Sequence, residues 1–367
     1  MKKQEGDNLK KGKLKKFFSI IVSLLLISLA GICISARIPS YMNNDNAALM
    51  AAALTVSKGN YDVKSTEKPT EKPTEKAVVT AKPVKETKPV SSSFSSSYYN
   101  TYKGHKNSQK YPVYTKHYEE GGDKYKNFYV KNNTWFDLNI GAELKSQLGF
   151  NFEKGSDVQV LIYHTHTSES YLDCDVGYYY SDFYPRTSDT RYNVTRVGEE
   201  IAKSLRKEGI GVIHDTTSHD DTYNGSYDRS YQTVQSYLKK YPKIKVTLDI
   251  HRDSIGADEY KVKPTFTHNG KKGAQIMIMS GYDPSGEYGF PDWEYNLRFA
   301  LRLQKSCEDN FSGMTRPLNF GDFVYNMNVN TGSLLIEVGT EANTLSEAEY
   351  SGKLLGKALA KVLQKDN

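Results

Sequence analysis

Hydrophobic and polar positions in the second half of the chain follow the patterns of alternating strands and helices. Val158–Tyr163 is a nearly continuous apolar run, which is typical of a strand buried on both faces of a sheet. Asn193–Lys207 has apolar residues at helical spacing, and Gly209 after it is a helix stop signal. The same reasoning predicts strands at Gly211–His214, Ile244–Ile250, Ala274–Met279 and Leu334–Val338, helices at Tyr231–Leu238 and Trp293–Cys307, and a last helix from a capping box of Ser346 and Glu349 to about Leu363.

Two segments do not follow this alternation. The Tyr- and Asp-rich range 168–191 is expected to be a loop, and 259–272 is expected to be a β-hairpin centred on Asn269-Gly270. Strands that alternate with helices imply a mostly parallel sheet with helices on both faces. Residues 127–367 are therefore predicted to form one α/β domain.

The N-terminal third predicts a membrane segment followed by a tether. Residues 17–36 contain no charged side chain, and about 20 such residues can cross a bilayer as a helix. The basic tail 1–16 is expected to stay in the cytoplasm, which places the rest of the chain outside. A cleaved signal peptide ending near Ile34-Ser35-Ala36 is the alternative. The range 37–126 is rich in Pro, Ser, Lys and Glu, and is predicted to be a disordered tether.

The charge distribution argues against a nucleic-acid-binding domain. The chain has a formal net charge of +6, and most of it lies on the Lys residues of the range 1–16. A domain that binds nucleic acid needs a basic surface of its own. With 3 Cys, the chain is also neither a disulfide-rich scaffold nor a zinc ribbon.

Candidate chemistry gathers where the predicted strands end. The first strand is followed by His-Thr-His-Thr-Ser-Glu at 164–169, a central strand leads into Asp-Ile-His-Arg-Asp at 249–253, and the last strand carries Glu337. In open α/β sheets, ligands bind beyond the carboxyl ends of the strands. Two histidines and a carboxylate from separate strands match a catalytic zinc site, where the pKa of a bound water falls to about 7. A further carboxylate can transfer the proton of that water.

Each of these residues also has a structural interpretation. For Glu337, a carboxylate inside an apolar strand, the alternative is an ion pair with Arg252 or Arg316. Asp249 precedes His251 by two residues and faces the same side, so it is a candidate ligand or the partner that orients an imidazole. The other histidines are expected to lie outside the site: His105, His117, His214, His219 and His268.

The segments VLIYHTHTSESY, LDIHRD and LLIEVGTEANTLSEAEYSGKLLGKALAKVL resemble the stage II sporulation protein P family. The resemblance covers roughly 127–367 and implies a fold like that of zinc-dependent N-acetylmuramoyl-L-alanine amidases. It implies a membrane-anchored peptidoglycan hydrolase that cleaves the amide between N-acetylmuramic acid and L-Ala, with an endopeptidase activity on cross-bridges. It also implies a role in engulfment during sporulation beside stage II sporulation proteins D, a lytic transglycosylase, and M, a membrane scaffold.

The resemblance suggests roles for individual residues. His164 and His251 resemble zinc ligands of the amidases, and Glu337 resembles their catalytic glutamate. The amidases place another ligand, a Glu, at the start of the helix after the first strand, where this chain has no acidic residue. The expected substitutes are, in order, Glu169, Asp189 and His166.

The predicted mechanism is zinc-assisted amide hydrolysis with Glu337 as general base and then general acid. Arg252 and Arg316 are expected to hold substrate carboxylates or the developing oxyanion. Two alternatives stay open at this point. One is a different metal-dependent cell-wall hydrolase, such as a carbohydrate deacetylase, and the other is a non-catalytic scaffold that binds the wall.

Overall fold

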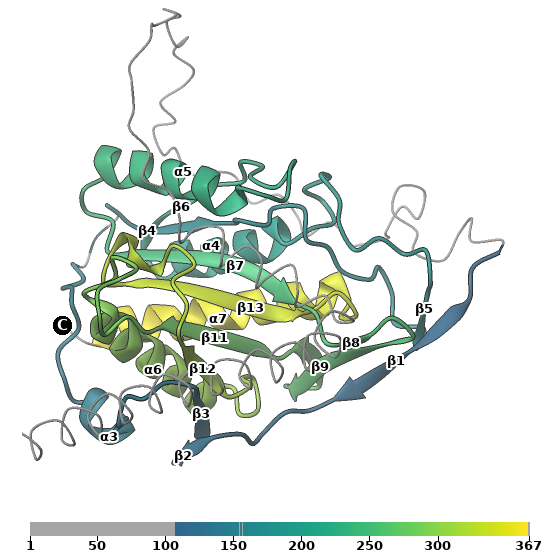
Figure 1. Ribbon diagram of the computed structural model, residues 1–367, viewed down its shortest axis with the longest axis horizontal. Coiled ribbons are helices and arrows are strands. Elements are labelled where there is room, and N and C mark those ends of the chain that lie inside the picture. The colour runs from purple at the N-terminus through teal and green to yellow at the C-terminus, as the bar shows by residue number, and fades with distance from the viewer. Residues whose placement is uncertain (1–106, 154, 156, 366–367) are drawn as a thin grey trace, which may run out of the picture. The chain divides into compact units, whose positions relative to one another are not determined.

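The computed structural model describes residues 107–365 except 154 and 156 (Figure 1). No helix in this part of the chain is both long and apolar enough to span a bilayer. The predicted membrane segment 17–36 and most of the predicted tether lie outside the described residues. The described residues form two sheets, and the helices pack mainly on the larger one.

The larger sheet has the strand order β2-β3-β12-β11-β13-β7-β4-β6. Its strands are β2 (Asp123–Tyr125), β3 (Phe128–Asn132), β12 (Leu318–Gly321), β11 (Ile276–Gly281), β13 (Ser333–Thr340), β7 (Val246–Asp253), β4 (Val158–Tyr163) and β6 (Gly211–His214). Among these described strands, β2–β3 and β11–β13 are antiparallel pairs, and the other neighbours are parallel. The predicted α/β class is therefore confirmed, with a mixed sheet in which parallel pairs predominate.

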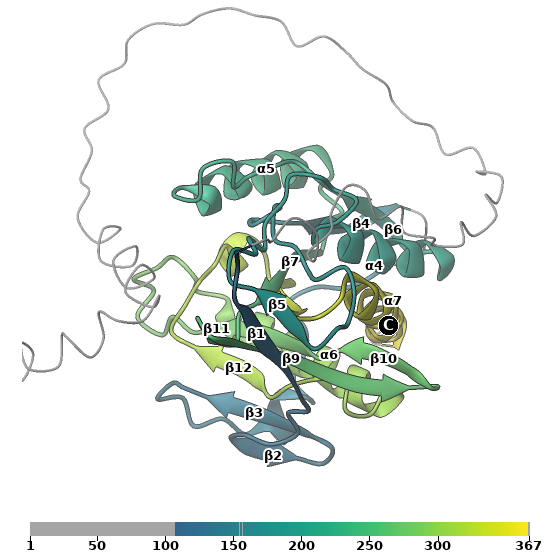
Figure 2. The ribbon, with the colours of Figure 1, turned by 90° about the vertical axis from the view of Figure 1, so that its right-hand side faces the viewer.

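Two crossovers place helices on opposite faces of this sheet. Helix α4 (Thr195–Lys207) connects β4 to β6 on one face, and α5 (Ser226–Lys240) returns from β6 to β7 on the other (Figure 2). Right-handed crossovers require this arrangement, because the chain reverses its direction across the sheet between the two connections. Helices α6 (Trp293–Asn310) and α7 (Leu345–Lys365) lie on the same face as α4. Both faces of the sheet therefore carry helices, as expected.

The main core lies between the sheet and helices α4, α6 and α7. Val197, Ile201 and Leu205, the predicted apolar face of α4, are completely buried in it. Gly352 and Gly356 let α7 approach the α4 backbone closely, because a β-carbon at either position would come within 2.8 Å or 2.7 Å of an α4 carbonyl oxygen. This close contact with α7 holds α4 against the sheet, and α4 in turn holds the loop that leads into it.

The smaller sheet lies beyond the carboxyl ends of β7 and β13 (Figure 1). It has the order β10-β9-β1-β5, and β8 pairs with β9. The strands are β1 (Lys110–Lys116), β5 (Tyr178–Tyr180), β8 (Gly256–Ala257), β9 (Tyr260–His268) and β10 (Lys271–Ala274). The hairpin predicted at 259–272 is confirmed as β9 and β10, with Asn269 and Gly270 in the left-handed region between them.

Two predicted boundaries are wrong. The tether predicted for 37–126 ends too late, because β1 and β2 lie inside that range. β1 forms a parallel pair with β9, a partner far along the chain, so no local sequence pattern indicates that β1 is a strand.

The capping box of α7 uses Thr344 and Glu347 instead of Ser346 and Glu349. The Glu347 backbone N–H donates to Thr344 Oγ1 at 3.2 Å, and the Thr344 N–H donates to Glu347 Oε2 at 3.0 Å.

Replacement of Gly270 by alanine is expected to lower the free energy of unfolding by about 1 kcal/mol. Gly270 has φ +70°, which disfavours an L side chain, and an added β-carbon would meet no atom within 4 Å. The cost therefore comes from the backbone alone. Denaturant unfolding of Gly270→Ala measures it, with Asn269→Gly as the control that keeps the turn. Equal midpoints for Gly270→Ala and the unmodified chain would contradict this account of the turn.

Candidate metal centre

Three buried side chains gather at the carboxyl ends of β4 and β7. His166 and Glu169 follow β4, and His251 lies in β7. One potential ligand atom from each lies within 4.8 Å of the others. The Glu169 carboxylate lies between the rings, with Oε1 3.5 Å from His166 Nδ1 and Oε2 3.5 Å from His251 Nδ1. Two histidines and one glutamate are a donor set that catalytic zinc sites use.

The turn after β4 directs His166 and Glu169 into this cluster. The Glu169 N–H donates to the His166 carbonyl at 3.1 Å, which closes the turn. The Glu169 carbonyl then accepts from the Val194 N–H at 2.8 Å, and an isolated bridge joins Glu169 to Arg186. The cluster is thus tied both to the segment 168–191 and to the residues just before α4. This segment was expected to be a loop, but it contains strand β5, which pairs with β1.

The charge of Glu169 is compensated although its side chain is almost fully buried. The Arg252 backbone N–H donates to Oε2 at 3.1 Å, and Arg186 Nη2 lies 3.4 Å from Oε1. Burial alone would raise the pKa of Glu169, but Arg252, His166 and His251 hold it well below its usual range. Glu169 is therefore an ionised carboxylate that can serve as a metal ligand.

The second ring nitrogen of His251 faces Asp249. His251 Nε2 lies 2.9 Å from Asp249 Oδ1, which is an ion-pair contact without hydrogen-bond geometry. Asp249 also accepts from Thr165, whose N–H donates to Oδ1 at 2.8 Å and whose Oγ1 donates to Oδ2 at 2.6 Å. A carboxylate on the far nitrogen of a ligand histidine fixes its tautomer and its orientation. Asp249 therefore lies where the sequence places an orienting partner, and Nδ1 of His251 stays directed at Glu169.

His164, expected to be a ligand, lies outside the cluster, and His166 takes its place. His164 Nδ1 lies 2.8 Å from the Ile250 carbonyl, and its Nε2 lies 3.0 Å from His214 Nε2. A β-carbon at Gly198 of α4 would come within 2.7 Å of His164 Nε2, so this ring faces α4. Strand β4 ends just before His164, and in the turn that follows the two histidines of His-x-His point to different sides. Burial lowers the pKa of His164 to about 3, so the ring is neutral.

Glu337 lies beside the cluster with a carboxylate oxygen unused. It pairs in register with His251 across β13 and β7. Its Oε2 is buried and has no hydrogen-bond partner among the described residues. Burial and the nearby Asp253 raise the pKa of Glu337 to about 8. The alternative ion pair is not formed, because Arg316 Nη1 lies 2.8 Å from Asp253 Oδ2 and Arg252 faces the cluster. Glu337 is thus available for proton transfer beside three potential metal ligands.

Comparison with known sequences identifies the family. A profile of the family described as stage II sporulation protein P (SpoIIP) matches residues 37–360. The chain belongs to the SpoIIP family. Stage II sporulation protein P of Bacillus subtilis (strain 168) is 30% identical over an alignment of 207 residues, which covers 53% of this chain and 48% of that protein. The alignment thus spans about half the length of this curated relative.

Solved structures of amidases are similar to this SpoIIP-family chain over 57% of its length. They include N-acetylmuramoyl-L-alanine amidase AmiC2 of Nostoc punctiforme, with 10% identity, a TM-score of 0.33 and 98% of that chain covered. The CwlD amidase from Clostridioides difficile in complex with the GerS lipoprotein has 11% identity, a TM-score of 0.36 and 98% coverage. N-acetylmuramoyl-L-alanine amidase from Clostridium difficile 630 has 17% identity, a TM-score of 0.33 and 97% coverage. At these values the likeness identifies neither the activity nor the site.

Three other predicted residues of the SpoIIP-family chain are not among the three side chains of the cluster. Asp189 lies outside the cluster and accepts from Arg191 Nε at 2.9 Å. Arg252, which is 8% exposed, donates from Nη2 to the Pro185 carbonyl at 3.0 Å. Arg316 is 6% exposed and pairs with an aspartate, as described above. Arg252 Nη1 lies 3.9 Å from Glu169 Oε1 and so borders the cluster, whereas Arg316 lines a surface pocket. A substrate-binding role for either arginine stays a prediction.

Sequence reasoning missed three residues that surround His166. Tyr223 stacks on His166 with ring centroids 4.9 Å apart, and Tyr227 packs edge-on at 5.6 Å. The guanidinium group of Arg186 lies 5.3 Å from the centroid of the Tyr223 ring. Tyr223 is 53% exposed, so it covers the solvent side of the cluster. With 28 Tyr in the chain, no local pattern distinguishes these two from the others.

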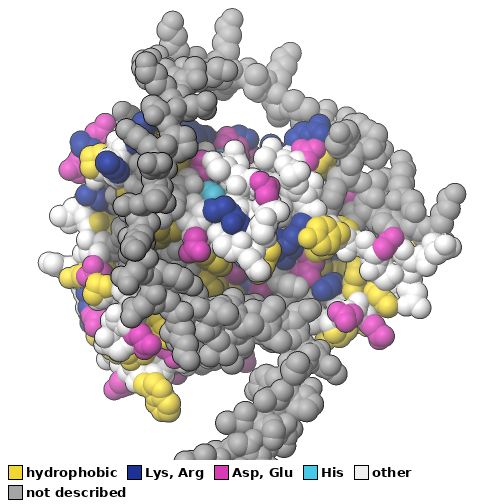
Figure 3. Space-filling model, turned by 45° about the horizontal axis from the view of Figure 1, so that its top comes forward, with side chains coloured by type: hydrophobic (Ala, Val, Ile, Leu, Met, Phe, Trp, Pro, Cys, Tyr) yellow, Lys and Arg dark blue, Asp and Glu magenta, His cyan; other side chains and the backbone are white. Residues whose placement is uncertain are grey.

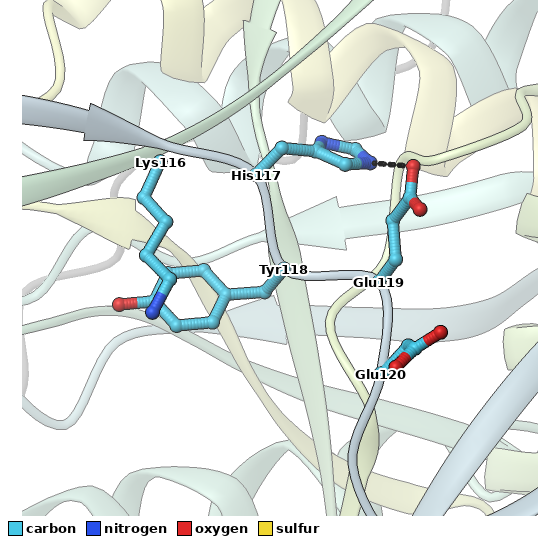
Figure 4. A pocket seen from close by; sticks show the side chains of 5 residues that line it. All are labelled: Lys116, His117, Tyr118, Glu119 and Glu120. Atoms are coloured by element: carbon cyan, nitrogen blue, oxygen red, sulfur yellow. Dashed lines mark ion pairs between the residues drawn. The ribbon is translucent and has the colours of Figure 1, made fainter.

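A separate surface pocket of about 490 Å³ is lined by Lys116, His117, Tyr118, Glu119 and Glu120 (Figure 4). It contains none of the three cluster residues. His117, which the sequence places in solvent, has Nδ1 2.7 Å from the Thr265 carbonyl and Nε2 3.1 Å from Glu119 Oε1. On the face shown in Figure 3, acidic and basic side chains are interspersed and histidine is visible only in a small spot.

Proposed function

We propose that the chain is a zinc-dependent peptidoglycan hydrolase that cleaves the amide between N-acetylmuramic acid and L-Ala. The observation that carries this proposal is the buried His166–Glu169–His251 cluster with Glu337 beside it. Membership of the SpoIIP family supports a cell-wall role in sporulation. The proposal places the domain outside the cell membrane, where its substrate lies, held there by the predicted segment 17–36.

The donor set fits zinc. Two imidazole nitrogens and a carboxylate oxygen provide three protein ligands, which leaves the fourth position that catalytic zinc sites keep open. Asp249 supplies the partner that ligand histidines normally have on their second nitrogen. The chemistry that zinc supplies in such a site is activation of water near neutral pH and polarisation of a carbonyl group.

The residues of the chain divide the remaining work. The positive charge of zinc in the cluster would lower the pKa of Glu337 from its raised value of about 8. The ionised Glu337 Oε2 would then accept the proton of the attacking water and return it to the amine of L-Ala as that amine leaves. Arg252 and Arg186 hold the Glu169 carboxylate between the two rings. Tyr223 covers His166 and limits the access of bulk water to the cluster.

Digestion of purified peptidoglycan by the full-length chain tests this function. The products are identified by mass spectrometry, with and without a chelator and with zinc restored. We expect intact stem peptides with a new amino group on L-Ala, lost with the chelator and recovered with zinc. Release of acetate without stem peptides would support a deacetylase instead. A folded, zinc-loaded chain that binds peptidoglycan and yields no product would support the non-catalytic scaffold.

A further inference from the structure

A turn with unusual backbone geometry lies directly before the 3-10 helix η1 (Met327–Val329). Tyr325 and Asn326 have φ values of 42° and 58°, so two consecutive non-glycine residues adopt the left-handed conformation. Such pairs are uncommon and persist only where the surrounding structure holds them. The Tyr325 ring stacks on Tyr227 of α5 with centroids 5.4 Å apart. The turn is thus pressed against the helix that borders the metal centre.

The Asn326 side chain ties this turn to α5 through two hydrogen bonds. Its Nδ2 donates to the Tyr227 carbonyl at 2.9 Å and to Ser230 Oγ at 3.0 Å. A carbonyl oxygen can only accept, so the amide nitrogen must face α5, and both of its hydrogens are used. An ionised aspartate at position 326 would have no hydrogen to donate to the Tyr227 carbonyl, so this contact requires the amide group.

From Ser230 a chain of hydrogen bonds continues to the metal centre. Ser230 Oγ lies 2.7 Å from Thr165 Oγ1, and Thr165 Oγ1 donates to Asp249 Oδ2 at 2.6 Å. Ser230 Oγ also lies 3.1 Å from the Tyr227 carbonyl, the other possible acceptor of its single hydrogen. Because the Thr165 hydroxyl hydrogen goes to Asp249, the shorter contact of 2.7 Å between the two hydroxyl groups requires the hydrogen of Ser230. Every donor in the series from Asn326 onward therefore points toward the Asp249 carboxylate. Ser230, Thr165 and Asp249 are all buried.

We propose that Ser230 and Asn326 are positioning residues for the metal centre. They act through Thr165 and Asp249 on His251, and keep its Nδ1 directed at Glu169. The Asp249 carboxylate can orient the His251 ring only if its own position is fixed, and this chain of hydrogen bonds holds it through Oδ2, whereas His251 faces Oδ1. The inference rests on the proposed metal centre, and it adds two residues from other parts of the chain to it.

The test is the zinc affinity of the full-length chain, measured by competition with a chromophoric chelator. Ser230→Ala removes the hydroxyl group at a helical position where alanine is favourable. Asn326→Gly removes the amide at a position where glycine adopts the left-handed conformation freely. Because loss of a residue behind a ligand typically costs 10–100-fold in metal affinity, each variant is expected to bind zinc about 10-fold more weakly. Ser236→Ala is the matched control, because Ser236 lies on the same helix and its Oγ donates only to the Gln232 carbonyl at 2.9 Å.

The melting temperature of the metal-free variants and the absorption spectrum of their Co²⁺ complexes separate positioning from folding. We expect metal-free melting within a few degrees of that of the unmodified chain and an altered Co²⁺ spectrum. Unchanged zinc affinity in both variants, with zinc bound normally by the unmodified chain, would overturn the positioning role and leave the proposed function intact. If zinc affinity falls in both variants only together with a lower melting temperature of the metal-free protein, the positioning role is overturned as well. An unmodified chain that binds no zinc would overturn the proposed function and this inference together.

Discussion

Replacement of Glu337 by glutamine is expected to reduce peptidoglycan hydrolysis by about 10²–10⁴-fold, the usual range for loss of a general acid–base group. Zinc affinity is expected to stay within about twofold of that of the unmodified chain, because Glu337 is not one of the three donors. Only the loss of a donor, or of a residue that orients a donor, typically lowers metal affinity 10-fold or more. The fold should also survive, since glutamine has the same shape and Glu337 Oε2 has no hydrogen-bond partner to lose. The measurements are the initial rate on purified peptidoglycan and the zinc content of the same preparation.

The control for this variant is Glu200→Gln. Glu200 lies on α4 and pairs with Lys203 Nζ at 2.8 Å, at a site where the same chemical change should leave the rate unchanged. A Glu337→Gln chain that hydrolyses peptidoglycan at the unmodified rate would contradict the proton-transfer role. A chain that loses zinc as well as activity would show that Glu337 belongs to the ligand set.

Replacement of His166 by alanine is expected to lower zinc affinity by more than about 100-fold, because loss of a ligand exceeds the 10–100-fold cost of losing an outer partner. The His166 side chain supplies one of the three donors, and the other side chains beside Glu169 Oε1 are Arg186 and Arg252, which are cations and cannot bind zinc in its place. Hydrolysis should fall with the bound zinc. Competition titration against a chelator measures the affinity, and product analysis measures the activity.

His268→Ala controls for the removal of an imidazole ring. His268 lies at the end of β9, and its ring packs edge-on against Phe311, away from the cluster. Its loss should leave zinc affinity unchanged. If His166→Ala binds zinc as tightly as His268→Ala does, the ligand set of this account is wrong.

The central part of the fold was predictable because each element there has a local pattern. β4 spans Val158–Tyr163, the bounds of the predicted strand, and α4 begins two residues inside the predicted helix. Both elements are buried by neighbours on the larger sheet, which is what their apolar spacing signals. β1 has no such pattern. Its residues are exposed or only partly buried, and its order depends on pairing with β9 and β5.

The candidate site was predictable in its position and only partly in its membership. The carboxyl ends of β4, β7 and β13 do converge, which places Glu169, His251 and Glu337 together. The choice between His164 and His166 depends on the direction of a turn, which residue spacing does not reveal. Ser230 and Asn326 join the site only through hydrogen bonds between distant segments, so residue type and local order carry no signal for them.

The most direct test of the metal centre is anomalous diffraction at the zinc absorption edge from crystals of the zinc-loaded protein. The account predicts a single strong peak between His166 Nδ1, the Glu169 carboxylate and His251 Nδ1. It also predicts that Glu337 lies beside the peak without binding the ion. A peak between the facing Nε2 atoms of His164 and His214, or no peak at the His166–Glu169–His251 cluster, would contradict it.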